Sequence, residues 1–164
     1  MNQRSFPTGG PRFVTVFLML VPMLALLGGC SSGPEPVWAS KPYPGTGERL
    51  LWEYSLLTLE KTGYPLGAGI DPIALEVRSG WQSHLSPFKD RGFRRRAYMR
   101  IVTDEEGQLN VEARVQVQRN AALVRPSDPR YAEWEDEPDD EVAARMLLTH
   151  VHAYAGTPLE LKNE

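Results

Sequence analysis

Three histidines are the side chains best suited to acid–base chemistry or metal binding in this sequence of 164 residues. His150 and His152 stand two positions apart in a segment with helical spacing. They therefore point to different faces and do not form the i, i+4 pair that can share a metal ion. We interpret His150 as a residue at the edge of the core and His152 as solvent-facing. His84 lies in a polar segment without a cysteine nucleophile or a G-x-S-x-G motif. The sequence therefore predicts no catalytic residue, no metal site and no cofactor.

The strongest local positive charge comes from four arginines within residues 94–100. In a β-strand, alternate residues share a face, so three of these arginines lie together, and one from the next segment joins them. These candidate binding residues are Arg94, Arg96, Arg100 and Arg114. Such a face could bind an envelope protein, an anionic envelope polymer or lipid headgroups. The alternative is a solvated face that is partly neutralised by Glu112 and by residues 128–141. That segment holds eight acidic residues and could itself dock on the arginines.

The only cysteine of the sequence, Cys30, excludes an intrachain disulfide and a cysteine-based zinc site. Residues 1–12 are polar and positively charged, and residues 13–27 form an apolar run interrupted by Pro22. This run is short for a transmembrane helix, which takes about 20 apolar residues. It is typical of the apolar region of a secretory signal peptide.

The residues at the end of this run, Leu27-Gly28-Gly29-Cys30, resemble the lipobox of bacterial lipoprotein signal peptides. The resemblance implies a diacylated Cys30 thiol, cleavage after Gly29 and acylation of the new amino terminus. Two or three acyl chains are enough for stable anchoring in membrane lipid. Ser31, where an aspartate would signal retention, implies transfer to the periplasmic side of the outer membrane if the source is a diderm bacterium. An uncleaved signal anchor that ends in a cysteine is the alternative.

Cleavage after residue 29 leaves 135 residues and changes the net charge from −3 to −5, because two arginines and no acidic residue are lost. That length suits one domain, and the acidic balance gives no support to nucleic-acid binding. We expect a signal peptide (1–29), a lipidated cysteine with a Pro/Gly-rich tether (30–47), a single α/β domain (48–158) and a C-terminal tail (159–164). The aromatic residues Trp38 and Tyr43 of the tether are either isolated there, docked on the domain or placed at the lipid headgroups.

The first half of the domain is expected to hold a helix and one strand. Residues 48–62 contain good helix formers, and we favour a helix although the apolar residues also alternate as in a strand. The Asp71-Pro72 pair predicts a turn, residues 74–81 a strand, and residues 82–92 a loop.

The second half has the clearest pattern. Apolar and polar residues alternate in residues 93–103, apart from Arg95 on the apolar side, and again in residues 109–119, which predicts a β-hairpin with one buried face. A loop over residues 121–137 leads to a helix that starts near Asp136 and Pro138 and ends at Gly156. The predicted apolar stripe of this helix consists of Val142, Ala143, Met146, Leu147, His150, Val151 and Tyr154.

These elements predict an α+β fold. We expect a two-layer sandwich in which a small antiparallel sheet, centred on the hairpin 93–120, is covered on one face by an N-terminal and a C-terminal helix. The order of a helix ending in Thr62-Gly63-Tyr64, a strand ending at Trp81, the hairpin and a final helix is similar to that of small envelope-assembly lipoproteins. This resemblance is architectural and implies no role for individual residues.

The function expected from these features is that of a non-enzymatic structural or assembly component of the cell envelope, anchored to the membrane. A binding module for an anionic envelope glycan or lipid is the alternative. A hydrolase that uses His84 or the acidic loop is the least favoured hypothesis.

Overall fold

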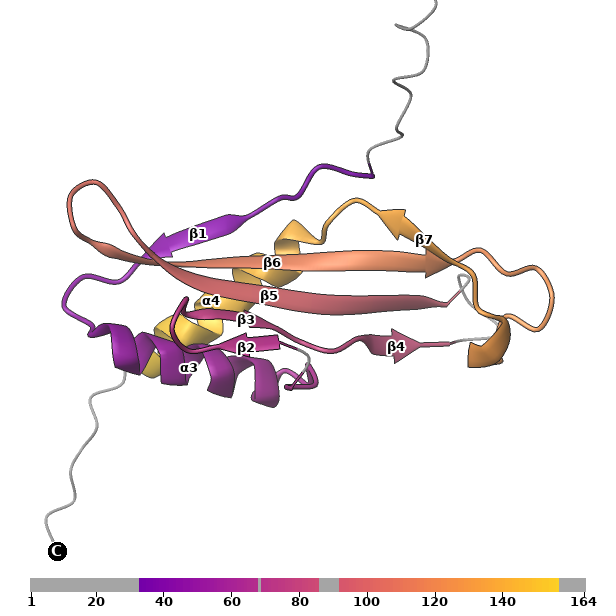
Figure 1. The fold of residues 1–164 in the computed structure, drawn as a ribbon, viewed down its shortest axis with the longest axis horizontal. Helices are drawn as coiled ribbons and strands as arrows, with labels where there is room; N and C mark the ends of the chain where they lie inside the picture. The colour runs from indigo at the N-terminus through magenta and orange to yellow at the C-terminus, as the bar shows by residue number, and fades with distance from the viewer. Residues whose placement is uncertain (1–32, 68, 86–91, 157–164) are drawn as a thin grey trace, which may run out of the picture. The chain divides into compact units, whose positions relative to one another are not determined.

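The computed structural model describes residues 33–67, 69–85 and 92–156 (Figure 1). The expected signal peptide, the lipobox residues Leu27, Gly28, Gly29 and Cys30, and the tail 159–164 lie outside the described residues. In the part of the chain that is described, no helix has the length and apolarity needed to cross a membrane.

A long β-hairpin forms the centre of the fold, as the alternating pattern predicts. Strand β5 spans Phe93–Thr103 and strand β6 spans Leu109–Asn120, and the two pair antiparallel along the whole of β5. The turn is held by Asp104, whose Oδ1 accepts hydrogen bonds from the amides of Glu106 and Gln108 at 3.1 and 2.8 Å. Gly107 supplies the positive φ of +80° that the turn requires.

Five short strands extend the hairpin into an antiparallel sheet of seven strands, so the predicted sheet of two or three strands is too small. Its order is β1-β6-β5-β3-β2, with β4 also beside β5 and β7 also beside β6. The short strands are β1 (Ala39–Pro42), β2 (Gly69–Asp71), β3 (Glu76–Arg78), β4 (Gln82–His84) and β7 (Trp134–Glu137). Three or four residues are too few to display a period of two, so these strands leave no clear signal in the sequence.

The turn expected at Asp71 joins β2 to β3. Its carboxylate oxygen Oδ1 accepts hydrogen bonds from the amides of Ile73 and Ala74, both at 2.9 Å. The strand predicted over residues 74–81 is only three residues long, because Leu75 has a left-handed φ of +54° and interrupts it. The loop predicted over residues 82–92 begins with strand β4 instead.

Helix α3, Glu48–Lys61, confirms the preference for a helix in this segment. Its buried residues are Leu51, Ser55, Thr58 and Leu59. Their spacing gives the helix a single buried side. The helix ends at Lys61 with Thr62 as its C-cap, and Gly63 follows with a φ of +80° and donates a hydrogen bond to the carbonyl of Glu60.

Helix α4, Glu141–Gly156, starts later than predicted. Asp140 caps it, since its Oδ1 accepts a hydrogen bond from the amide of Ala143 at 2.9 Å. The predicted start at Asp136 is wrong because residues 134–137 pair with β6 as strand β7. A single-turn 3₁₀ helix, η2 (Pro129–Tyr131), precedes β7.

The predicted apolar stripe of α4 is partly wrong in phase. The buried residues are Ala144, Leu147, Leu148 and Val151. Val142 and Met146 of the predicted stripe are 70% and 58% exposed, and His150 is exposed too. Apolar residues occupy so much of this helix that two stripes satisfy the helical period, and packing against the sheet selects one of them.

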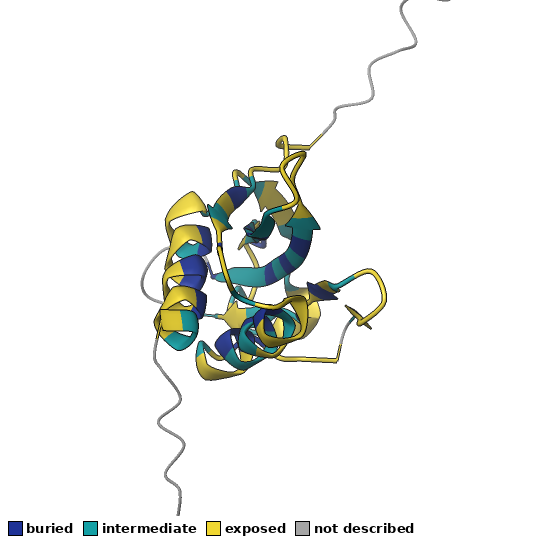
Figure 2. Cartoon of the chain, turned by 90° about the vertical axis from the view of Figure 1, so that its left-hand side faces the viewer, coloured by how far each residue is buried: buried dark blue, intermediate teal, exposed yellow. Residues whose placement is uncertain are grey.

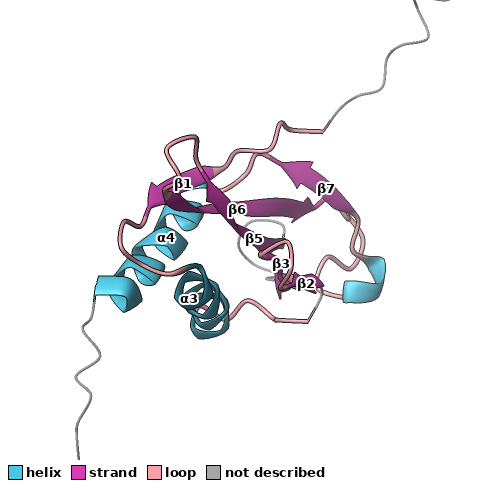
Figure 3. Cartoon of the chain, turned by 60° about the vertical axis from the view of Figure 1, so that its left-hand side comes forward, coloured by secondary structure: helices cyan, strands magenta, loops and turns pink. Residues whose placement is uncertain are grey.

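Residues from both helices and from the inward side of the hairpin form one core (Figure 2). Helix α4 contacts β6 and β1, helix α3 contacts β5, and the helices contact each other (Figure 3). The fully enclosed side chains include Leu51, Leu59, Met99, Val111, Val115 and Val151. The structure thus shows an α+β fold with the hairpin at its centre.

The segment expected to be a tether contributes to the fold from residue 37 onward. Residues 39–42 pair with residues 110–113 of β6 as strand β1. The side chain of Tyr43 is buried, and its hydroxyl donates a hydrogen bond of 2.8 Å to the carbonyl of Leu148 in α4. Of the alternatives for the two tether aromatics, docking on the domain is the one observed, because the ring of Trp38 also meets that of Tyr98 at 6.4 Å.

Candidate functional site: the arginine face

The outward side of the β5–β6 hairpin gathers all four arginines singled out in the sequence. Their positions alternate with those of Ala97, Met99 and Val115, whose side chains point into the core, so the arginines point away from it. We call this surface the arginine face and define it by Arg94, Arg96, Tyr98, Arg100, Glu112, Arg114, Gln116 and Gln118. All eight residues are intermediate in exposure. The face is therefore partly covered and is not a freely solvated one.

Three tryptophans from segments outside the hairpin cover the guanidinium groups. Arg94 lies between Trp81 and Trp134, with its Cζ at 4.3 and 4.5 Å from the two ring centroids. Trp81 also covers Arg96 at 4.4 Å, and Trp38 covers Arg100 at 4.3 Å. Cation–π contacts of this kind contribute roughly 0.5–2 kcal/mol each, more as the pair is desolvated. They also hold the guanidinium planes in fixed orientations.

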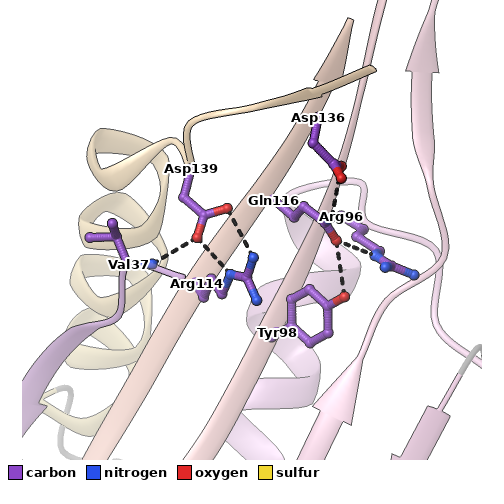
Figure 4. Close-up of polar contacts among 7 residues, drawn as sticks. All are labelled: Val37, Arg96, Tyr98, Arg114, Gln116, Asp136 and Asp139. Atoms are coloured by element: carbon purple, nitrogen blue, oxygen red, sulfur yellow. Dashed lines mark hydrogen bonds and ion pairs between the residues drawn. The ribbon is translucent and has the colours of Figure 1, made fainter. Parts of the chain in front are cut away.

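Hydrogen bonds divide the face into two halves. In one half, the Nε atoms of Arg94 and Arg96 donate to the neutral side chains of Gln118 and Gln116, at 2.7 and 2.8 Å. Both glutamines in turn donate to Asp136 Oδ1, Gln118 at 2.7 Å and Gln116 at 3.2 Å. Figure 4 shows the bond from Gln116. The carboxylate reaches these arginines only through the glutamines, so two positive charges share one indirect negative charge.

In the other half, each arginine has a carboxylate of its own. Arg100 Nε pairs with Glu112 Oε2 at 2.7 Å. Arg114 forms a bidentate pair with Asp139, with distances of 2.6 and 3.2 Å, and the Asp139 side chain is only 3% exposed. The acidic segment therefore docks on the arginines at Asp139, one of the alternatives that the sequence leaves open.

Asp139 also fixes the start of the described chain. Its Oδ2 accepts a hydrogen bond of 2.8 Å from the backbone amide of Val37 (Figure 4). Because the same carboxylate holds Arg114, one side chain joins the start of the described chain to the arginine face.

The environment of Arg94 is unfavourable for its charge. Burial lowers the pKa of Arg94 below its ordinary value, the neighbouring Arg96 lowers it further, and Asp136 partly opposes both effects. An arginine nevertheless stays protonated at neutral pH. An anionic group placed beside Arg94 and Arg96 would therefore reduce the repulsion between them.

A groove of about 420 Å³ opens at the other end of the face, beside β2 and β3. Its lining combines two aromatic rings with two arginines and two carboxylates: Trp38, Tyr98, Arg78, Arg100, Asp71 and Glu76. Aromatic faces beside charged hydrogen-bonding groups are suited to a small polar ligand that carries a ring.

The histidines are not gathered into a site. His84 is exposed on β4, with its ring 5.1 Å from that of Phe93. His150 and His152 are both exposed on α4, so the prediction for His150 at the edge of the core is wrong. Within the described ranges, no three histidine, cysteine or acidic side chains lie close enough to hold a metal ion.

Sequence reasoning missed the residues that complete the arginine face. Tyr98, Gln116 and Gln118 could have been found, because they occupy the same alternating positions as the arginines. The three tryptophans could not, since they come from a tether, a linker and a short strand with no local pattern. No protein-family model and no curated protein sequence matches this chain. Its function is therefore inferred from the chemistry of the arginine face.

Proposed function

We propose that this chain is an exported lipoprotein, anchored through acylated Cys30, that acts in the cell envelope by binding and not by catalysis. Support comes from the lipobox-like residues Leu27-Gly28-Gly29-Cys30 and from the docking of residues 37–43 on the domain, which leaves only a short link to the lipid. In a diderm bacterium, the anchor would lie on the periplasmic side of the outer membrane. The domain would be a two-layer sandwich whose helices cover the inner side of the sheet and leave the arginine face available.

The observation that carries the proposal is the pairing of Arg94 and Arg96 with neutral glutamines. Each of these arginines uses its Nε for that bond and has a ring against its guanidinium plane, and its terminal nitrogens make no hydrogen bond to any residue that the structure describes. Terminal nitrogens of this kind suit a carboxylate or another flat anion, and hydrogen bonds to charged groups contribute about 1.5–3 kcal/mol each. An envelope protein with an acidic surface fits this half of the face, and the role is that of an assembly component.

The test compares partner capture by matched arginine variants. The lipidated protein, tagged at its C-terminus, is used as bait in detergent-solubilised envelope of the source bacterium. Arg96→Gln removes the two terminal nitrogens of one guanidinium group. It should reduce capture of the partner at least tenfold, since at least one charged hydrogen bond is lost. Arg49→Gln is the control, because Arg49 lies on α3 with its side chain 90% exposed and should leave capture unchanged.

The comparison has a decisive outcome. A protein that is captured by wild type and by Arg49→Gln but not by Arg96→Gln, and that also binds when purified, supports the proposal. Equal capture by all three, with the Arg96 variant folded by circular dichroism, would overturn it.

The groove beside β2 and β3 favours a second candidate, a module that binds an anionic envelope glycan. Here Trp38 and Tyr98 would stack on a sugar ring and Arg100 would bind its acidic group. This candidate predicts salt-sensitive binding of purified envelope glycan that is lost in Trp38→Ala and kept in Arg96→Gln. Binding that depends on Arg96 alone would exclude the groove as the site.

A further inference from the structure

The chain enters the described fold beside strand β7. A Cβ placed on Gly33 would lie 3.5 Å from Asp136 Oδ2, and Val37 is bonded to Asp139 three residues later along the acidic segment. Cys30 precedes Gly33 by three residues, which span at most about 11 Å when fully extended. A lipid on Cys30 would therefore be tied to the domain by at most this length of chain from Gly33.

The loop between β6 and β7 carries apolar side chains that face solvent. Leu123 is 82% exposed, Val124 is 71% exposed and Tyr131 is 47% exposed. Two basic residues, Arg125 and Arg130, lie next to them in the sequence. We call these five residues the apolar tip. Its composition combines aliphatic residues, an aromatic ring with a polar end, and long cationic side chains.

Hydrogen bonds within the loop fix its conformation, and this conformation keeps the side chains of the apolar tip exposed. Asn120 is fully buried at the end of β6, where its Nδ2 donates to the carbonyl of Pro126 at 2.9 Å. Its Oδ1 accepts hydrogen bonds from the amides of Ala122 and Glu133, both at 3.0 Å. Arg125 adopts a left-handed φ of +52°, which is uncommon for a residue other than glycine. The loop thus keeps its aliphatic residues out of the core.

Gly33, the first described residue, and the apolar tip lie at the same end of the sheet. Asp136, beside Gly33, pairs with Gln118 of β6, and the loop begins only three residues after Gln118. Figures 1 and 3 both show the first described residues beside β7, and they show the loop leading directly into the start of that strand.

We infer that the apolar tip inserts into the lipid surface that carries acylated Cys30, an inference that rests on the proposed anchoring. Leu123 and Val124 would enter the outer part of the acyl region, and Tyr131 would lie at the headgroups. Arg125 would extend to lipid phosphates while its aliphatic stem stays in apolar surroundings, whereas Arg130 is already paired with Asp128 at 3.0 Å. Two aliphatic side chains bind a membrane weakly alone. The anchor makes their insertion an intramolecular step with a high effective concentration, so a weak contact suffices.

The consequence is a second attachment point that fixes how the domain stands on the membrane. With the anchor alone, the domain can rotate about its link. With the apolar tip also inserted, the β7 end of the sheet is held at the lipid surface and the opposite end, with the turn at Asp71, points away.

The test measures lipid contact at the tip in the lipidated full chain. The protein is reconstituted in vesicles of phosphatidylethanolamine and phosphatidylglycerol. With Cys30 acylated, a cysteine introduced by Leu123→Cys is labelled with an environment-sensitive fluorophore. Ile73→Cys is the matched control, because Ile73 is an equally aliphatic residue, 94% exposed, in the turn between β2 and β3. We expect a blue-shifted label at position 123 and several-fold stronger quenching by lipid-borne nitroxide there than at position 73.

Each outcome bears on a different step. Equal quenching at the two positions, with Cys30 shown by mass spectrometry to be acylated, would overturn the inference and leave the anchoring intact. An unmodified Cys30 would overturn the anchoring and the inference together. A label at position 123 that stays exposed on vesicles but becomes shielded when an envelope protein is added would assign the tip to a protein partner instead. Because the arginine-dependent capture described above needs no lipid contact at Leu123, its result does not decide this test.

Discussion

Replacement of Asp139 by asparagine is expected to weaken both the fold and the attachment of the segment around Val37 to the domain. The Asp139 carboxylate accepts three hydrogen bonds, two from Arg114 and one from the amide of Val37, with distances between 2.6 and 3.2 Å. Asparagine keeps the size of the side chain and one acceptor oxygen but removes its charge. The variant therefore leaves the guanidinium of Arg114 without its ion pair in a largely enclosed position.

The size of the effect follows from the burial of the pair. Removing one partner of a fully buried ion pair costs about 3–5 kcal/mol. The Asp139 side chain is 3% exposed but that of Arg114 is 16% exposed, so the orphaned guanidinium can recover part of its hydration. The ring of Tyr98 remains against it at 5.3 Å. We therefore expect Asp139→Asn to lower the free energy of unfolding by about 2–3 kcal/mol, which is less than for a pair with no access to water.

Urea unfolding followed by circular dichroism measures this difference. The exposed Arg49–Glu53 pair provides the control, because Glu53→Gln should change stability by less than about 0.5 kcal/mol. In an Arg114→Met background the charge to be orphaned is gone, so Asp139→Asn should cost at least about 1 kcal/mol less there than in wild type. Equal costs in the two backgrounds, or a cost below about 0.5 kcal/mol in wild type, would refute the assignment of Asp139 as the partner of Arg114.

Three further predictions concern the core and the turns. The hydroxyl of Tyr43 is buried against the carbonyl of Leu148, and burial raises the pKa of Tyr43 to about 12. The free energy of unfolding should therefore fall as pH rises from about 10 to 12, because the tyrosine of the unfolded chain ionises first. Urea unfolding at alkaline pH should show this fall in wild type and a smaller one in Tyr43→Phe. Met99→Ala should lower the free energy of unfolding by about 2–5 kcal/mol, because the side chain is 1% exposed and a cavity would remain; a thermal melt close to that of wild type would contradict this. Gly63 and Gly107 both have a φ of +80°, so alanine at either position should lower the free energy of unfolding by about 1–2 kcal/mol in a urea titration. The loss should be larger at Gly63, because the new Cβ would lie 3.0 Å from the side-chain nitrogen of Gln82, whereas nothing lies within 4 Å at Gly107.

The sequence was sufficient to predict the elements that are long enough to repeat. Strands β5 and β6 each extend over at least five alternations, so their pairing and their buried side follow from the pattern. Helix α3 was predicted correctly despite its ambiguous alternation, because glutamate, leucine and lysine favour a helix and Gly63 marks its end.

The remaining elements depend on contacts that no local pattern records. Residues 134–137 are three-quarters acidic, which suits a helix N-terminus as well as an edge strand, and only pairing with β6 decides between them. In α4, too many positions are apolar for periodicity to select the buried side. Trp38, Trp81 and Trp134 are far apart in sequence, and the arginines that bring them together lie on one strand.

The same distant contacts connect residues 37 and 38 to the proposed binding surface. Asp139 holds Val37 and Arg114 at once, and Trp38, the next residue along the tether, covers Arg100 of the same face. Because Asp139 makes both contacts, we expect that loss of the contact to Val37 weakens the contact to Arg114, and the reverse. If the tether detaches, both Arg114 and Arg100 lose a contact, whereas Arg94 and Arg96 keep theirs to Trp81, Trp134 and the glutamines. Arg94 and Arg96, to which we assign partner binding, should thus be unaffected when the tether detaches. The tether is held instead by the half of the face in which Arg100 and Arg114 are already paired with carboxylates.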